Sequence, residues 1–94
     1  MKRDMQAEAK LVRDILVNDW NPQGRKVQDA EYDFFIWPIQ KRLMAGVPRE
    51  ALEKYLMWGA SDLIGSPVPE AKARQVAEKL IALKLIDTDP KYRS

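Results

Sequence analysis

The stretch NDWNPQGRKVQDAEYDFFIWPIQ, residues 18–40, contains the signals that end one predicted helix and begin the next. Before it, apolar residues recur at spacings of three and four, which is typical of one face of an amphipathic helix. These residues are Met5, Ala9, Val12, Leu16 and Trp20. Pro22 ends the helix because proline disfavours the helical conformation in the residue before it, and Gly24 permits the following turn. The sequence therefore predicts a helix over about 4–19.

A second helix is predicted over about 29–45. Asp29 is a candidate N-cap, because its carboxylate can accept backbone N–H bonds, and further acids in the first turn complement the positive helix end. The predicted buried stripe consists of Tyr32, Phe35, Ile36, Ile39 and Leu43. Pro38 lies inside this segment, where proline removes a helical hydrogen bond and clashes with the preceding turn. We therefore expect a kink or a restart near Trp37.

Two more helices are predicted, over about 48–64 and 70–85. Gly46 ends the second helix, and Pro48 follows as a first-turn residue of the third. A proline-rich break separates the last two helices. The tail over 87–94 is polar and is predicted to fray.

The third helix has a predicted inner face and a predicted outer face. The inner residues are Leu52, Tyr55, Leu56, Gly59 and Leu63, and the outer residues are Glu50, Glu53 and Lys54. Glycine in a helix interior costs about 1 kcal/mol relative to alanine, so Gly59 suggests a close approach of another helix. Simple tolerance of glycine at this position is an equally open explanation.

The predicted fold class is all-α: a single small domain over residues 1–94, with four helices in an irregular antiparallel bundle. A chain of 94 residues has room for one modest core and no second domain. No stretch shows sustained alternation of apolar and polar residues, so no strand is predicted. The expected kink near Pro38 works against a straight, symmetric bundle.

Composition excludes several classes of chemistry. The chain has no cysteine and no histidine, which removes thiolate nucleophiles, the commonest general base and the commonest transition-metal ligand. No glycine-rich phosphate-binding motif occurs. We therefore expect no cofactor, no metal and no enzymatic activity. No apolar run is long enough to span a bilayer and no signal peptide is evident, so we expect a cytoplasmic protein that is not embedded in a membrane.

Two short motifs carry a resemblance to a known family. The sequence has W-N-P at residues 20–22 and E-Y-D at 31–33. In this pattern the chain resembles the YugE-like domain, a family of small all-helical bacterial proteins of unknown function, over roughly 11–83. Asn21 stands where that family commonly has Asp. The resemblance implies a helical fold and a binding role, as in accessory or immunity-like proteins, more than catalysis.

The motif positions Trp20, Asn21, Pro22 and Tyr32 are interpreted as structural. Trp20 lies on the apolar stripe of the first helix and is predicted to pack against the start of the second helix. The Tyr32 hydroxyl is positioned to bond across the first turn, which would fix how the second helix leaves the loop.

A candidate partner-binding surface lies beside the predicted stripes. At about 100° per residue its large apolar side chains fall outside those stripes, and exposed apolar patches of this kind mark protein interfaces. The apolar members are Phe34, Trp37, Met57 and Trp58, and the predicted polar rim is Glu31 and Asp33. Core packing of the same four side chains remains an open alternative. The predicted partner is another protein or a second copy of the chain.

The alternative function is nucleic-acid binding through two basic pairs near the ends of the second helix. The pairs are Arg25 with Lys26, and Lys41 with Arg42. They would neutralise phosphates and give a salt-dependent affinity. Sixteen basic and fourteen acidic residues are interspersed, for a formal charge of +2, so a concentrated basic face is not predicted. Asp29 and Asp33 are spaced to share a hard cation, although helix capping accounts for them more simply.

Overall fold

The computed structural model describes residues 4–24, 26 and 29–84, and every regular element within these residues is helical. The elements are α1 (Met5–Ile15), η1 (Leu16–Trp20), η2 (Asp29–Phe35), α2 (Ile36–Met44), α3 (Arg49–Trp58), η3 (Gly59–Ile64) and α4 (Glu70–Ile81). The elements η1 and η3 are π-helical turns that continue α1 and α3, whereas η2 is a 3₁₀-helix. The predicted all-α fold with four helices is confirmed. The predicted tail over 87–94 lies outside the described residues.

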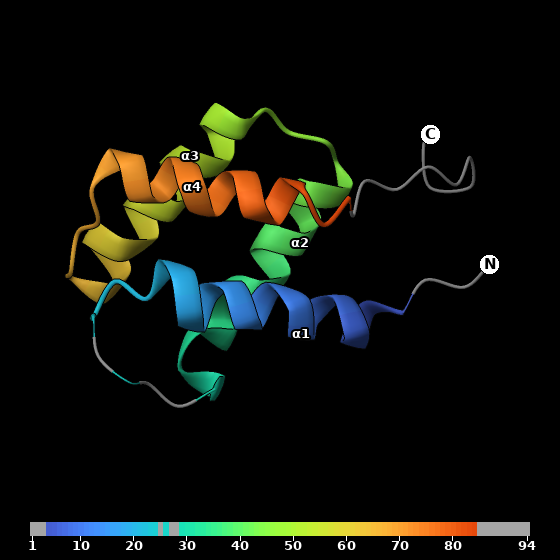
Figure 1. Ribbon diagram of the computed structural model, residues 1–94, viewed down its shortest axis with the longest axis horizontal. Coiled ribbons are helices and arrows are strands. Elements are labelled where there is room, and N and C mark those ends of the chain that lie inside the picture. The colour runs from blue at the N-terminus through green and yellow to red at the C-terminus, as the bar shows by residue number, and fades with distance from the viewer. Residues whose placement is uncertain (1–3, 25, 27–28, 85–94) are drawn as a thin grey trace.

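The four α-helices pack at irregular angles (Figure 1). In that view α1 and α4 run across the molecule, α3 lies behind α4, and α2 runs steeply between them. The helix α1 packs against α2 and α4, and α3 packs most extensively against α4. This arrangement agrees with the prediction of an irregular bundle and differs from a straight four-helix bundle.

The first helix begins and ends at residues whose side chains or backbone favour a boundary. Asp4 is its N-cap, and its carboxylate accepts a hydrogen bond from the Ala7 N–H at 3.0 Å. Asn21 has a positive φ of 26°, a conformation in which asparagine is enriched, and it ends η1. Within the predicted stripe, Val12, Leu16 and Trp20 are fully buried.

The segment predicted as one helix over about 29–45 is divided into η2 and α2. The restart predicted near Trp37 occurs at Ile36. Pro38 is consequently the third residue of α2, in the first turn, where backbone N–H groups have no partner within the helix. The missing N–H of proline therefore costs α2 no hydrogen bond, and the irregular geometry lies before Pro38.

The predicted faces of the third helix are wrong at two positions, Leu63 and Glu53. Leu63 is 47% exposed rather than buried, and Ala60, which is not among the predicted inner residues, is fully buried. The π-helical geometry of η3 explains this change, because a wider turn shifts which residues share a face. Glu53, predicted to face outward, is only 7% exposed because α4 packs across this side of α3.

The last helix is shorter than the predicted span of about 70–85. The helix α4 ends at Ile81. After the Ala82 N–H bond to the Glu78 carbonyl, the N–H groups of Leu83 and Lys84 donate to the carbonyls of Leu80 and Ile81, which lie three residues back. Such bonds tighten and terminate a helix. Lys84 has a positive φ of 57°, which takes the chain out of the helical path, and residue 85 lies outside the described part of the chain.

One hydrophobic cluster joins residues of all the α-helices. Its largest fully buried side chains are Trp20, Tyr32, Leu16, Ile39, Leu52, Leu56, Leu80, Val12 and Val76. Those of α1 with η1, of α3 and of α4 are four apart in sequence, so each of these helices contributes one face to a shared core, to which η2 adds Tyr32 and α2 adds Ile39.

Gly59 of η3 lies against the Phe35 ring of η2. A Cβ atom on Gly59 would lie 2.8 Å from Cε1 of Phe35, which is shorter than non-bonded carbon atoms tolerate. The Phe35 ring is 4% exposed and contacts the rings of Trp20 and Tyr55, so it has little room to move. The predicted close approach at Gly59 is confirmed, and the neighbour is an aromatic ring of η2.

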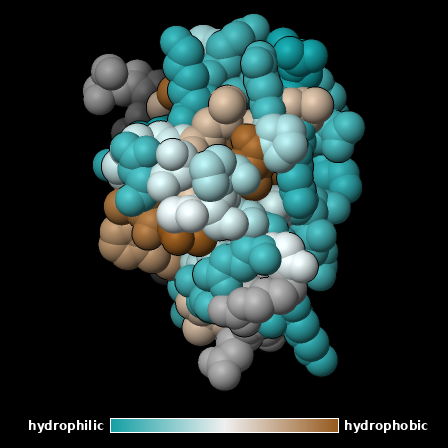
Figure 2. Space-filling model, turned by 90° about the vertical axis from the view of Figure 1, so that its left-hand side faces the viewer, coloured by the Kyte–Doolittle hydropathy of each residue, from teal (hydrophilic) through white to brown (hydrophobic). Residues whose placement is uncertain are grey.

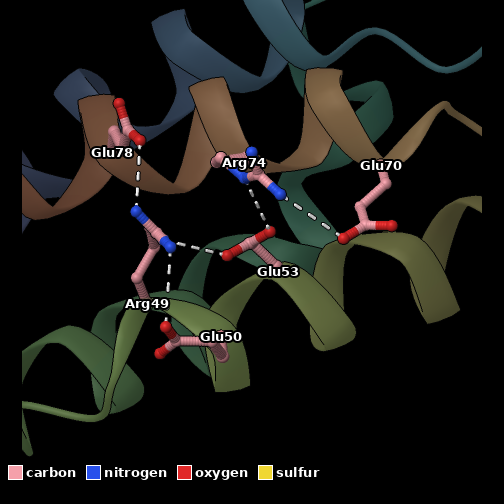
Figure 3. A network of polar contacts seen from close by, with 6 residues as sticks. All are labelled: Arg49, Glu50, Glu53, Glu70, Arg74 and Glu78. Carbon is pink, nitrogen blue, oxygen red and sulfur yellow. Dashed lines mark hydrogen bonds and ion pairs between the residues drawn. The ribbon is translucent and has the colours of Figure 1, made fainter.

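The buried carboxylate of Glu53 joins α3 to α4 through a network of ion pairs (Figure 3). Its Oε2 accepts a hydrogen bond from Arg49 Nε at 3.0 Å, and its Oε1 lies 3.7 Å from Arg74 Nε. Arg49 also pairs with Glu50 at 3.5 Å and with Glu78 of α4 at 3.4 Å. The burial of Glu53 is therefore compensated by two guanidinium groups.

We predict that Gly59→Ala lowers the free energy of unfolding by about 1–2 kcal/mol, because overpacking against Phe35 outweighs the gain of alanine over glycine in a helix. Urea denaturation of both proteins measures the difference. In a Phe35→Leu background the penalty of Gly59→Ala should shrink, since the smaller side chain leaves room for the methyl group. Equal penalties in both backgrounds would contradict this explanation.

Replacing Glu53 should change the free energy of unfolding much less than replacing its two arginine partners. Glu53→Met is predicted to change the unfolding free energy by less than about 1.5 kcal/mol, because an apolar side chain fills the space and the arginines still reach water. The double variant Arg49→Met/Arg74→Met should cost about 3 kcal/mol or more, because it leaves a buried carboxylate unpaired. Urea denaturation measures both, with Lys41→Met as control, because Lys41 is exposed on α2 and lies outside this network. Similar costs for the two variants would show that the ion-pair attraction itself dominates.

Candidate functional site

Trp20 joins the end of η1 to the start of the second helical segment. Its ring makes edge contacts with Tyr32 at a centroid distance of 5.4 Å and with Phe35 at 5.1 Å. The Tyr32 hydroxyl donates a hydrogen bond to Asn21 Oδ1 at 2.8 Å, and the Pro22 carbonyl accepts one from Ser66 Oγ at 2.9 Å. These contacts account for the W-N-P and E-Y-D positions as elements of structure.

Three aromatic side chains are substantially exposed at the surface. Phe34 is 73% exposed, Trp37 is 53% exposed and Trp58 is 45% exposed. Met57, the fourth member of the predicted apolar surface, is half-buried and packs against the core cluster. The predicted surface is thus exposed at its three aromatic positions, whereas Met57 packs largely as a core residue.

Phe34 and Trp58 line the same groove. The groove has a volume of about 710 Å³ and is lined by Phe34, Pro38, Arg42, Ala51, Lys54, Tyr55 and Trp58. Its first wall follows from residues four apart in η2 and α2, and its second wall from residues three or four apart on α3. We call this set of seven residues the aromatic groove. Trp37 and Met57 are not among the described residues that line it.

A continuous row of rings connects the aromatic groove to the core. Ring centroids are 5.6 Å apart for Phe34 and Phe35, 6.4 Å for Phe35 and Tyr55, and 5.8 Å for Tyr55 and Trp58. Because Phe35 is buried and also contacts Trp20, the exposed rings rest on a fixed support. The first two pairs are edge-to-face and the third is tilted. Aromatic pairs in edge-to-face geometry add about 0.5–1.5 kcal/mol each beyond the area that they bury.

Arg42 lies over the Tyr55 ring inside the aromatic groove. Its guanidinium carbon is 4.0 Å from the ring centroid, and Nη1 donates a hydrogen bond to the Pro38 carbonyl at 3.0 Å. Burial raises the pKa of the Tyr55 phenol above its usual 10.0, and the nearby positive charge of Arg42 lowers it to a smaller extent. The guanidinium group is held in place, with most of its five N–H donors still available.

The two basic pairs of the nucleic-acid prediction do not form one described surface. Arg25 lies outside the described residues, Lys26 and Lys41 are exposed, and Arg42 lies in the aromatic groove. The sequence predicted that Arg42 would contact phosphate, but it did not predict that the guanidinium group lies over the Tyr55 ring. That contact depends on α3, which is remote in sequence.

Asp33 faces α1 and does not serve as a rim for the exposed rings. Its two carboxylate oxygens accept hydrogen bonds from Arg13, from Nε at 2.9 Å and from Nη2 at 2.8 Å. This bidentate pair occupies both oxygens, which argues against the shared cation considered for Asp29 and Asp33. The side chain of Asp29 lies outside the described part of the chain, and Glu31 is exposed. Among the described residues no cluster of acidic side chains has the arrangement of a metal site.

Other apolar surface lies at the end of the molecule that carries η3 and the segment 65–69. Figure 2 faces this end and shows hydrophobic surface gathered toward one edge, with hydrophilic surface over most of the remainder. A smaller hollow of about 320 Å³ lies between Asp19 and α4, and the Lys79–Asp19 ion pair of 2.8 Å belongs to its lining. It has no exposed aromatic side chain, so the aromatic groove is the better candidate site.

Comparisons with protein-family models, with curated proteins and with solved structures found no match for this chain. The resemblance to the YugE-like domain therefore stays a prediction. None of the helices in the described part of the chain is both long enough and apolar enough to cross a membrane.

We predict that alkaline pH destabilises the protein partly through Tyr55. Its raised pKa means that the folded state favours the neutral phenol, so this contribution is complete below about pH 10 and is lost as the pH rises through the folded-state value. Urea midpoints measured from about pH 9 to about pH 12 should fall less steeply for Tyr55→Phe than for the wild type. Parallel curves for the two proteins would contradict the prediction.

Proposed function

We propose that this chain is a small, non-catalytic protein-interaction module that binds its partner through the aromatic groove. The single observation that carries the proposal is the meeting of Phe34 and Trp58, both substantially exposed, on one concave surface. Covering large exposed aromatic side chains with a partner removes apolar surface from water, which lowers the free energy of the complex. The composition of the groove also matches interface centres, which are enriched in Trp, Tyr, Phe and Arg.

The row of rings makes the aromatic groove suitable for binding because it is formed in advance. Phe34 rests on the buried ring of Phe35, and Trp58 contacts Tyr55. Arg42 is fixed by Tyr55 and by the Pro38 carbonyl. Side chains that are already ordered lose less conformational entropy when a partner binds, so more of the contact energy remains as affinity.

This proposal retains two of the four apolar residues in the surface predicted from the sequence. Phe34 and Trp58 contribute to the aromatic groove, while Trp37 lies on the neighbouring face of α2 and Met57 packs against the core. Arg42 and Lys54 replace the predicted acidic rim, because they are the charged residues in the groove lining.

Nucleic-acid binding by the basic pairs stays a prediction with weaker support. Of the described members, Lys26 and Lys41 are exposed, but Arg42 stacks on Tyr55 and donates a hydrogen bond to the backbone. A nucleic-acid surface needs cations that follow the phosphate backbone, and of these three residues only Arg42 lines the aromatic groove.

Alanine substitution in the aromatic groove tests the proposal. Trp58→Ala and Phe34→Ala should each weaken binding of the partner by about 2 kcal/mol or more, about 30-fold in dissociation constant, because both rings lie at the centre of the contact. The partner is first identified by quantitative capture from a native lysate and then purified. Its affinity for each variant is measured by calorimetry, and circular dichroism checks that helicity is unchanged.

Leu11→Ala is the matched control, because Leu11 is 47% exposed on α1 and does not line the aromatic groove. It should leave the affinity unchanged. The proposal fails if the purified partner binds Trp58→Ala, Phe34→Ala and Leu11→Ala with equal affinity. A loss confined to Trp37→Ala would move the interface to the neighbouring face of α2.

A further inference from the structure

The distribution of charge around the aromatic groove points to the chemistry of its occupant. The groove lining contains two charged residues, Arg42 and Lys54, and both are cationic. Among the described residues neither of them makes an ion pair, although Arg42 donates one hydrogen bond to the Pro38 carbonyl. The groove therefore combines apolar walls with positive charge that the described part of the chain does not neutralise.

Nearby acidic side chains are directed away from the aromatic groove. On α3, Glu53 pairs with Arg49 and with Arg74 of α4, and Glu50 pairs with Arg49 of its own helix. The groove is lined instead by Ala51, Lys54, Tyr55 and Trp58. Figure 3 shows the carboxylate of Glu50 turned toward Arg49, and the carboxylate of Glu53 between Arg49 and Arg74.

Next to Phe34, both oxygens of Asp33 are taken by Arg13 of α1. Asp33 and Glu53 thus lie in ion pairs at helix contacts, whereas Arg42 and Lys54 remain in the groove. An anionic ligand meets no repulsion from the described lining residues, whereas a cationic ligand would lie beside two like charges.

Resting on the proposed function, we propose that the occupant of the aromatic groove is a short acidic peptide segment of a partner protein, with an apolar anchor side chain. The anchor would pack between Phe34 and Trp58, and flanking carboxylates would pair with Arg42 and Lys54. A groove of about 710 Å³ is the right size for a few side chains. The planar guanidinium of Arg42 presents parallel N–H donors that suit a carboxylate.

A peptide fits these observations better than a nucleic acid does. Sequence-independent binding of a single strand requires a positive path that follows many phosphates, and the groove supplies two cations. The overall formal charge of +2 adds little attraction for a polyanion.

Peptide selection on the purified full chain tests this inference. A library of random twelve-residue peptides displayed on phage is selected on the wild type, and the affinity of each recovered peptide is then measured for the wild type and for Trp58→Ala. We expect the recovered peptides to be enriched in Asp and Glu around an aromatic or aliphatic residue. Their dissociation constants should rise about tenfold for Arg42→Gln/Lys54→Gln and a few-fold for Lys54→Gln alone, and should not change for Leu11→Ala.

Several outcomes would overturn the inference and leave the proposed function standing. Peptides that depend on Trp58 but are not enriched in acids, or that bind Lys54→Gln and Arg42→Gln/Lys54→Gln as tightly as the wild type, would exclude charge recognition. Recovery of no peptide would exclude a short segment as the occupant.

The assay also distinguishes other occupants of the groove. If a twelve-nucleotide oligothymidylate bound more tightly than the recovered peptides, and this binding were lost in Trp58→Ala, the groove would be assigned to single-stranded nucleic acid. Self-association in sedimentation experiments, abolished by Trp58→Ala, would make the occupant a second copy. If the recovered peptides bound Trp58→Ala with the same affinity as the wild type, the proposed function itself would be refuted.

Discussion

The ring of Trp20 lies where η1, η2 and the core meet, and its contacts with Tyr32 and Phe35 organise the rest of the structure. Burying an aromatic side chain of this size contributes roughly 4–6 kcal/mol from apolar area. Its indole N–H has no hydrogen-bond partner among the described residues, which costs about 1–3 kcal/mol. The hydrophobic contribution is larger, so Trp20 stabilises the junction despite this cost.

The position of Phe35 on Trp20 determines the position of the aromatic groove. Phe35 excludes any side chain at Gly59, which sets how closely η3 approaches, and it supports Phe34 and Tyr55 at the surface. The same packing brings η2 and α2 beside α3, so that residues remote in sequence line one groove. Core packing and the candidate binding surface are therefore parts of one aromatic structure.

Only part of the candidate site could be predicted from the sequence. The helical periodicity placed Phe34 and Trp58 outside the buried stripes, and both are exposed. It could not place Tyr55 and Arg42 together, because their contact depends on how α2 packs against α3. Residues four apart at Phe34, Pro38 and Arg42 were a signal for one wall of the groove, but nothing in a single sequence pairs that wall with α3.

The sequence by itself determined that the chain forms four helical segments, because local signals such as the Asn21–Pro22 stop and the spacing of apolar residues act within one or two turns. It did not predict the 3₁₀ geometry of η2 or the π-helical turns η1 and η3. The tertiary structure decided which polar residues are buried and which cations stay in the groove. Glu53 is buried since arginines of α3 and α4 meet there, and Arg13 holds Asp33 from a segment twenty residues away. Such pairings depend on helix packing, which local periodicity does not specify.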